Sequence, residues 1–306
     1  MTIIQGILLG ILQGVAEFLP ISSSGHLTLA QHLFGLDEVP LLFDVFLHLA
    51  TLTAVILYFR KKVWKLLKIL GRWIARRPEP EHTELEDDYL MGTDAAGRKT
   101  IIAIIITTAI TGAIGVVTSK LIPELPVKVI CVGFIVTSIL LVVSSILSNR
   151  QQKINADTQT SVQTSENAVS TDAATTPSTS APKGVSILQS IIIGIMQGVG
   201  TLPGISRSGS TIAGALFTKV DRKAAGDYSF IVSIPAILGA FVLELKDLGE
   251  VSSSVGIAPL IAGCAAAFAA GYVSLVFLMK LIRRGKLQWF ACYLIPVAIL
   301  GLIFLK

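Results

Sequence analysis

The sequence predicts an all-α integral membrane protein built as an inverted-topology repeat. Of its 306 residues, 52% are hydrophobic and only 15% are charged, and the mean hydropathy is +0.73. Several apolar runs reach the ~20 residues that a helix needs to cross a bilayer. One short segment also occurs twice, with Gly10 of the first copy matched by Gly194 of the second, a shift of 184 residues. Together these observations predict two related helical halves in a membrane.

Residues 1–148 form the first predicted repeat. It opens with two short segments at 3–36, which together are too short and too polar for two crossings of ~20 residues each. We therefore expect a re-entrant helix-loop-helix, which enters and leaves the membrane on one side. Three membrane-spanning helices are predicted to follow it. They lie at 42–59, 100–122 and 127–147, with a cytoplasmic loop at 60–99.

The second predicted repeat, residues 185–306, follows the same plan. A re-entrant pair at 185–218 precedes three spans, at 226–245, 257–282 and 289–305. Between the halves, residues 149–184 are rich in Ser, Thr, Ala, Asn and Gln and contain no aromatic residue. This composition predicts a disordered cytoplasmic linker.

The cationic segments predict the orientation of the two halves. An odd number of crossings separates the two re-entrant pairs, so the second half is expected to be inverted relative to the first. A single topology then places the basic segments 60–77, 219–223 and 283–286 in the cytoplasm, as the positive-inside rule requires. The net charge of +5 is therefore assigned to orientation and to anionic lipid headgroups, and no nucleic-acid partner is expected.

Small residues recur at four-residue spacing in the first helix of each re-entrant pair. Such a stripe lets another helix backbone approach closely. The two stripes are Gly6, Gly10 and Gly14 in the first pair and Ser190, Gly194 and Gly198 in the second.

The first copy of the repeated segment carries a carboxylate that the second copy lacks. Gln13 and Glu17 are four residues apart and should share one face of a helix. A carboxylate at membrane depth is costly, so Glu17 is a candidate functional residue. The structural alternative is that Glu17 only pairs with Arg207 or caps the loop.

The segment Ser22-Ser23-Ser24-Gly25-His26 offers hydroxyls, loop amides and an imidazole ahead of a short helix. Free N–H groups at a helix start suit an anion. A serine in this position is also very often only an N-cap. His26 could act as base, acid or nucleophile near neutral pH, although a lone histidine is usually structural.

The second copy supplies a guanidinium instead. Arg207 aligns with Ser23 in the repeat register and offers a planar fork suited to phosphate. If the two loops meet, one site would hold a carboxylate, an imidazole and a guanidinium from complementary halves. Asp44 and His48 share a helix face as well, which indicates either support for this site or a simple intrahelical pair.

These motifs resemble those of the undecaprenyl-diphosphatase family, the bacitracin-resistance phosphatases of bacterial envelopes. The first signature is Gln13-x-x-x-Glu17 followed by Phe-Leu-Pro-x-Ser-Ser-x-Gly-His26, and the second is the segment from Pro203 to Gly209. The resemblance implies removal of the terminal phosphate of undecaprenyl diphosphate, which recycles the carrier lipid for cell-wall synthesis. It also implies a multi-pass protein of the bacterial inner membrane, an active site facing outward, and a divalent cation, Mg²⁺ or Ca²⁺.

The resemblance assigns roles to particular residues. The catalytic residues it implies are Glu17, Ser23, His26 and Arg207. Substrate contacts are expected from Gln13, Ser22, Ser24, Gly25, Ser206, Ser208 and Gly209. The metal ligands would be Glu17 and Gln13, although many family members have Glu at the position of Gln13. Ser23 is the expected nucleophile, and His26 is the alternative.

Two other functions compete with that of a phosphatase of this family. Inverted repeats with broken helices are also typical of transporters, so a polyprenyl-phosphate transporter or flippase, alone or in addition, stays open. The other large class of membrane phosphatases needs a second histidine after its Ser-Arg motif, and no histidine follows His82. The expected partners are a polyprenyl diphosphate lipid and the bilayer, with a homodimer left open.

Overall fold

The computed structural model describes residues 1–36, 41–79, 88–121, 126–166, 183–244 and 256–304, and all regular secondary structure in these ranges is helical. The first half contains α1 (Ile3–Phe18), α2 (Ser23–Leu33), α3 (Leu41–Ile74), α4 (Asp94–Leu121) and α5 (Val127–Glu166). The second half contains α6 (Ile187–Val199), α7 (Arg207–Phe217), α8 (Arg222–Glu244), α9 (Ile257–Arg283), a 3₁₀ turn (Leu287–Phe290) and α10 (Ala291–Phe304).

In the part of the chain that the structure describes, six helical segments are long and apolar enough to cross a membrane. They are α3, α4, α5, α8, α9 and the 3₁₀ turn continued by α10. Many large apolar side chains on their outer surfaces, such as Ile105 and Val273, are exposed and have no protein partner to bury them. Such surfaces are stable in contact with lipid, so the prediction of an all-α, multi-pass membrane protein is confirmed.

The first helix of each short pair packs on a long helix of the other half. The small residues of α1 lie against α9, where a Cβ on Gly6 would approach the carbonyl oxygen of Pro259 to 2.6 Å. The small residues of α6 lie against α4, and Thr107 and Thr111 donate hydrogen bonds to the carbonyl oxygens of Ser190 and Gly194. The predicted role of both stripes in close packing is confirmed.

The duplication extends to the start of each pair. Thr2 caps α1 and Ser186 caps α6, and each forms a capping box with the glutamine three residues later, Gln5 or Gln189. Each box satisfies two backbone N–H groups that a helix start would otherwise leave unpaired. The same local sequence therefore starts the same helix twice.

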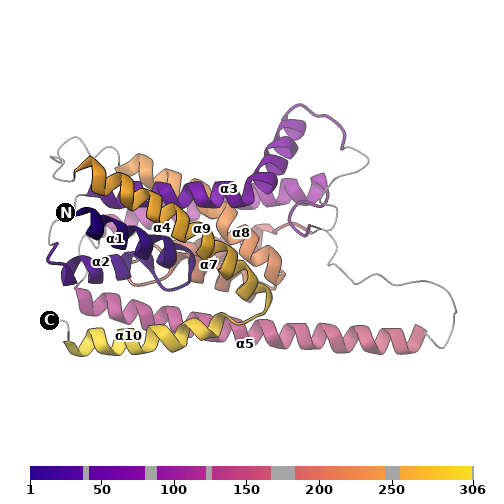
Figure 1. Ribbon diagram of the computed structural model, residues 1–306. Coiled ribbons are helices and arrows are strands. Elements are labelled where there is room, and N and C mark those ends of the chain that lie inside the picture. Colours follow the sequence, from indigo (N-terminus) through magenta and orange to yellow (C-terminus); the bar gives the residue numbers. More distant parts are fainter. Residues whose placement is uncertain (37–40, 80–87, 122–125, 167–182, 245–255, 305–306) are drawn as a thin grey trace.

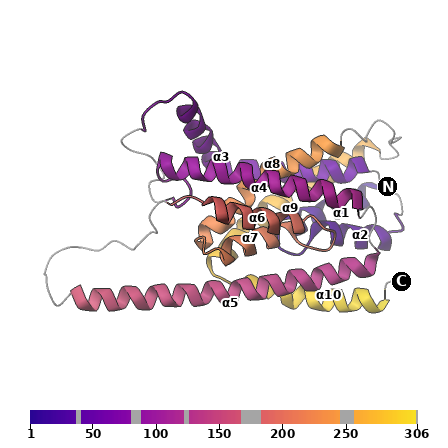
Figure 2. The ribbon, with the colours of Figure 1, turned by 180° about the vertical axis from the view of Figure 1, so that it is seen from behind.

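The long helices of the two halves also contact one another. α3 packs on its counterpart α8, and α5 packs on its counterpart α10. Lys62 of α3 lies 2.5 Å from Asp88 and also pairs with Asp227 of α8. Figures 1 and 2 show the resulting bundle from its two sides, with the short helices α1, α2, α6 and α7 lying between the pair α5 and α10 and the other long helices. The two halves are interlocked and form one body.

The prediction of a loop over 60–99 is wrong at both ends. α3 continues to Ile74 and α4 begins at Asp94. Leu66 and Ile69 are buried on the extension of α3, and Arg72 donates to the Asp94 carboxylate with Nε at 2.9 Å. Long basic side chains can extend from an apolar helix face into water, so the basic residues after 59 are compatible with a continuous helix.

The prediction of a disordered linker is wrong for residues 149–166, which continue α5. A helix that is already formed extends without the cost of a new nucleus. Arg222 of α8 also holds this extension, donating to Ser148 with Nε at 2.7 Å and to Gln152 with Nη1 at 2.6 Å. The rest of the predicted linker, up to residue 182, lies outside the described residues, as do the predicted span ends at 122, 245 and 305.

Candidate functional site

Each short pair turns sharply between its two helices. Ser22 ends the first turn with φ of 71°, and its Oγ accepts a hydrogen bond from the Gly25 amide at 3.4 Å. Ser206 ends the second turn, and its Oγ accepts from the Gly209 amide at 3.1 Å. Both serines therefore cap the helix that follows, in the same register.

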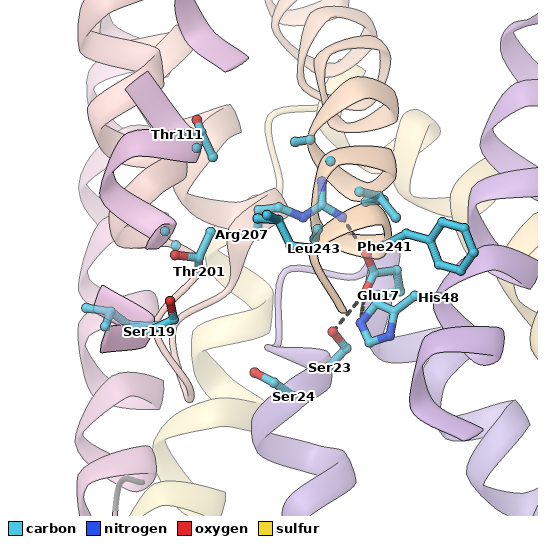
Figure 3. Close-up of a pocket in the computed structure, with 18 of the residues that line it drawn as sticks. Glu17, Ser23, Ser24, His48, Thr111, Ser119, Thr201, Arg207, Phe241 and Leu243 are labelled. Carbon is cyan, nitrogen blue, oxygen red and sulfur yellow. Dashed lines mark hydrogen bonds and ion pairs between the residues drawn. The ribbon is translucent and has the colours of Figure 1, made fainter. Parts of the chain in front are cut away.

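Glu17 lies where the two turns meet (Figure 3). Its Oε2 accepts from the Ser23 hydroxyl at 2.8 Å and from the Gln13 amide at 3.2 Å, and its Oε1 pairs with Arg207 Nη2. Glu17 is 6% exposed. The structure thus brings together Gln13, Glu17, Ser23 and Arg207, four of the residues that the sequence analysis assigned to the site.

Ser206 and the residues after it hold the second turn against the first turn and against α5. Ser208 Oγ donates to the carbonyl oxygen of Phe18 at 3.1 Å, and the Ser206 amide donates to Thr137 Oγ1 at 3.0 Å. A Cβ on Gly209 would lie 3.0 Å from Pro20. These three residues, predicted to bind substrate, fix the position of Arg207 relative to Glu17.

His26 does not lie in this group. Its Nδ1 is 2.9 Å from the Ser22 carbonyl oxygen, and its Nε2 is 2.9 Å from the Tyr293 hydroxyl. The ring packs against Phe134 at 4.9 Å between centroids. The bond to Ser22 turns the ring toward α5 and α10. Gly25 also lies against Phe134, so neither it nor His26 faces Glu17.

His48 of α3 lies beside Glu17 instead. Its Nε2 is 3.8 Å from Glu17 Oε2, and its Nδ1 is 2.8 Å from the carbonyl oxygen of Asp44. The Asp44 carboxylate accepts from Gln31, with one contact at 3.1 Å. The four-residue spacing of Asp44 and His48 was the sequence signal for His48. The two side chains do not pair, because the Asp44 carboxylate binds Gln31 and only its carbonyl oxygen contacts His48.

These groups line one end of a cavity of about 710 Å³. Its polar end is formed by Glu17, Ser23, Ser24, His48 and Arg207, with Ser206 and Ser208 nearby. The remaining wall comes mainly from α4, α8 and the second turn. Its α8 part is apolar and runs from Pro235 to Leu243, whereas α4 and the second turn add the hydroxyls of Thr108, Thr111, Thr118, Ser119 and Thr201 to their apolar side chains. Such a cavity suits a molecule with a charged head and a long apolar part.

Among the described residues, three buried polar atoms beside Glu17 or on the cavity wall have no hydrogen-bond partner. They are Gln13 Oε1, an acceptor, Arg207 Nη1, a donor, and the hydroxyl oxygen of Thr108. Within the described ranges, no three His, Cys, Asp or Glu side chains are grouped closely enough to hold a metal. A hard cation could still take oxygen from Gln13 and Glu17 if phosphate oxygens and water completed its shell. An oxyanion would in turn accept from Arg207.

Comparisons with known proteins agree with the motifs. The family described as bacitracin resistance protein BacA matches residues 6–300. A protein of Treponema denticola named undecaprenyl-diphosphatase is 42% identical over 299 residues, which cover 98% of this chain and 96% of that one. A protein with the same name from Desulforapulum autotrophicum is 34% identical, and the match covers 99% of this chain and 98% of that one. Another, from Carboxydothermus hydrogenoformans, is 33% identical, and the match covers 98% of this chain and 95% of that one.

The match runs from within α1 to within α10, and it includes every residue around Glu17. The chain therefore belongs to the bacitracin resistance protein BacA family.

Proposed function

We propose that this protein is a membrane phosphatase that hydrolyses undecaprenyl diphosphate to undecaprenyl phosphate and inorganic phosphate. The observation that carries the proposal is the group Ser23, Glu17 and Arg207 at the polar end of an otherwise largely apolar cavity. A hydroxyl, a base and a cation are the parts that phosphoryl transfer needs. The product would return the carrier lipid to cell-wall synthesis, as the names of its relatives support.

In the first step, Ser23 Oγ attacks the terminal phosphorus. Its proton passes to Glu17 Oε2, which already accepts the Ser23 hydrogen bond at 2.8 Å. The bond from phosphorus to the bridging oxygen breaks, and undecaprenyl phosphate leaves. Arg207 binds the phosphoryl oxygens, where charge develops, and its unpartnered Nη1 supplies a donor for them. Water then hydrolyses the phosphoserine and releases inorganic phosphate.

The apolar wall fits the polyprenyl chain. The cavity continues from Arg207 along the faces of α4 and α8, where glycines leave room close to the helix backbones. A lipid substrate keeps its tail in the bilayer, so a path between two spanning helices lets the diphosphate reach Glu17 without removing the tail from lipid.

A divalent cation, Mg²⁺ or Ca²⁺, would be held by Glu17 and by Gln13 Oε1. When bound, it would neutralise charge on the diphosphate. The unpartnered Gln13 oxygen supports this assignment, since hard cations prefer oxygen ligands.

The finer architecture is also part of the proposal. We propose an inverted repeat, residues 1–148 and 185–306, with re-entrant pairs at 3–36 and 185–218 and the active site facing the outer side. Exchanged packing of α1 on α9 and of α6 on α4 supports it. So do the opposite directions of α1 and α6, since α1 begins beside the N-terminus and α6 begins at the other end of the bundle (Figure 2).

Phosphate release from undecaprenyl diphosphate by the purified protein in detergent tests the function. We expect turnover that Ser23→Ala abolishes. A protein that moves polyprenyl phosphate across vesicle membranes but releases no phosphate would contradict the proposal and favour the transporter.

Thiol labelling tests the orientation. In a background without Cys131, Cys264 and Cys292, Leu33→Cys should react with a membrane-impermeant reagent in intact cells. Gln163→Cys should react only after the inner membrane is permeabilised. The reverse pattern would place the active site on the cytoplasmic side.

A further inference from the structure

We propose that His48 of α3, and not His26, is the imidazole that transfers protons at this site. The inference rests on the proposed phosphatase function and concerns the step that hydrolyses the phosphoserine. His48 lines the cavity beside Ser23 and Glu17, whereas His26 does not line it. The proposed role of His48 follows from the hydrogen bonds that hold the two imidazole rings.

The ring of His48 is oriented by its own helix. Nδ1 lies 2.8 Å from the Asp44 carbonyl oxygen, which can only accept, so Nδ1 carries a hydrogen. Nε2 of the neutral ring is then an acceptor. This nitrogen is the one directed toward Glu17 and Ser23 (Figure 3). A fixed tautomer with its free nitrogen in the cavity is the arrangement that a general base requires.

The distance from His48 Nε2 to Glu17 Oε2 leaves space for a reactant. At 3.8 Å the two atoms are too far apart for a direct hydrogen bond. A water molecule or a phosphate oxygen can contact both atoms at once. Because Ser23 Oγ is 2.8 Å from the same Glu17 oxygen, a water at this place would lie next to the phosphorylated serine.

His26 has no nitrogen available for this step. Its Nδ1 contacts the Ser22 carbonyl oxygen and its Nε2 contacts the Tyr293 hydroxyl, and its ring packs against Phe134 and Tyr293. These contacts explain His26 as a residue that holds the strained turn at Ser22.

The charged groups nearest to His48 come from α1, α7 and its own helix. Glu17 of α1 faces Nε2, and Arg207 of α7 lies on the far side of Glu17 and is paired with it. Asp44, on the same helix, faces Gln31. Residues 235–243 of α8 and 264–271 of α9, which lie at this level, include no charged side chain and only the thiol of Cys264 as a titratable group.

The proposed step balances as follows. Water attacks the phosphorus of phosphoserine and gives one proton to His48 Nε2. The bond from phosphorus to Ser23 Oγ breaks, and Oγ recovers from Glu17 the proton that it gave up in the first step. Inorganic phosphate leaves, and the imidazolium returns its proton to water.

The test is a set of histidine variants of the full-length protein, assayed with undecaprenyl diphosphate. His48→Ala should lower turnover by about 10²-fold or more, the usual contribution of a general base. Phosphoserine should accumulate on Ser23, because the first step does not need His48. Added imidazole should restore part of the turnover, and the pH dependence of the rate should change. His32→Ala, at an exposed position on α2, is the matched control and should keep wild-type turnover.

Other results separate failure of this inference from failure of the function. Wild-type turnover by His48→Ala, or restoration of His26→Ala but not His48→Ala by imidazole, would overturn the role of His48 while leaving the phosphatase intact. No phosphate release by the wild type would overturn the function itself. If His48→Ala does not fold, His48→Gln keeps the side-chain volume. It should still lose turnover and accumulate phosphoserine, and full activity in it would overturn the inference.

Discussion

The turns of the two short pairs have related backbones but different chemistry. Ser22 and Ser206 cap α2 and α7 through bonds to Gly25 and Gly209 in the same register. The glutamines on the preceding helices differ in what they contact. Gln13 donates to Glu17, whereas Gln197 donates to Thr111 at 3.1 Å and accepts from Thr211 at 3.3 Å.

The difference shows which parts of the duplicated segment form the fold and which form the site. Caps and small residues occur in both copies because each copy must start a helix and pack it closely. The charges occur once, with Glu17 in the first copy and Arg207 in the second, and they meet. A single site made from two halves needs only one carboxylate and one guanidinium. The second copy accordingly has Thr201 at the position that corresponds to Glu17.

The largest effect should come from the position where the copies differ most, Ser23 against Arg207. Ser23→Ala should lower phosphate release by about 10⁴-fold or more, as expected for loss of a nucleophile. His26→Ala should keep measurable activity, because its ring contacts the turn and not the cavity. Rapid quenching should trap a phosphoserine. An acid-labile phosphoramidate, with His26→Ala inactive and folded, would instead make His26 the nucleophile.

Arg207→Ala should lower the rate by about 10²-fold or more, since one charged transition-state contact is worth ~3–4 kcal/mol. Arg207→Lys should restore only part of this, because an ammonium cannot reproduce the planar fork. Steady-state kinetics on both variants measure the effect. Near-wild-type turnover by Arg207→Ala would remove the second copy from the site.

The two glutamines offer a matched pair. Gln13→Leu should lower turnover by about 10-fold, because Glu17 loses a donor worth ~1.5 kcal/mol or more. Gln197→Leu should leave turnover nearly unchanged and lower the free energy of unfolding by about 1–3 kcal/mol, because Thr111 and Thr211 lose a buried partner. Phosphate release and thermal unfolding in detergent separate the two. Equal losses of activity would mean that both copies serve the site.

The glycine stripes should differ in tolerance to a methyl group. Gly10→Ala places a Cβ against the backbone carbonyl of Gly263, and it should destabilise the protein by about 1–3 kcal/mol. Gly194→Ala meets the Ile110 Cβ at 3.0 Å and the Thr107 backbone at 3.2 Å, a smaller overlap than the 2.2 Å to the Gly263 oxygen, so its effect should be smaller. Thermal unfolding of the two variants measures the difference. A larger loss for Gly194→Ala would contradict the assigned contacts.

The smallest effect should come from the segment between the halves. Replacing residues 157–181 by a Gly/Ser segment of equal length should change turnover by less than about twofold, because such a linker keeps the reach of the chain. The replacement keeps Gln152, which Arg222 contacts. Inactivity with normal expression would assign this segment a role in the fold or the site.

The sequence by itself determined the spanning helices and the facing positions of Ser23 and Arg207 in the site. Apolar runs of spanning length are a local property, so the six long segments could be found without the structure. The repeat register aligned Ser23 with Arg207 because both copies keep their caps and glycines. The ends of α3 and α5 were missed because packing against Asp94 and Arg222 extends them.

Only the tertiary structure decided which histidine faces the cavity. His26 stands in the motif, yet its ring is held by Tyr293, a residue 267 positions later in the chain. His48 stands outside the motif, yet the packing of α3 places its ring next to Glu17. Sequence spacing fixes which residues share a helix, but the direction of a side chain depends on the rotamer that its distant neighbours allow.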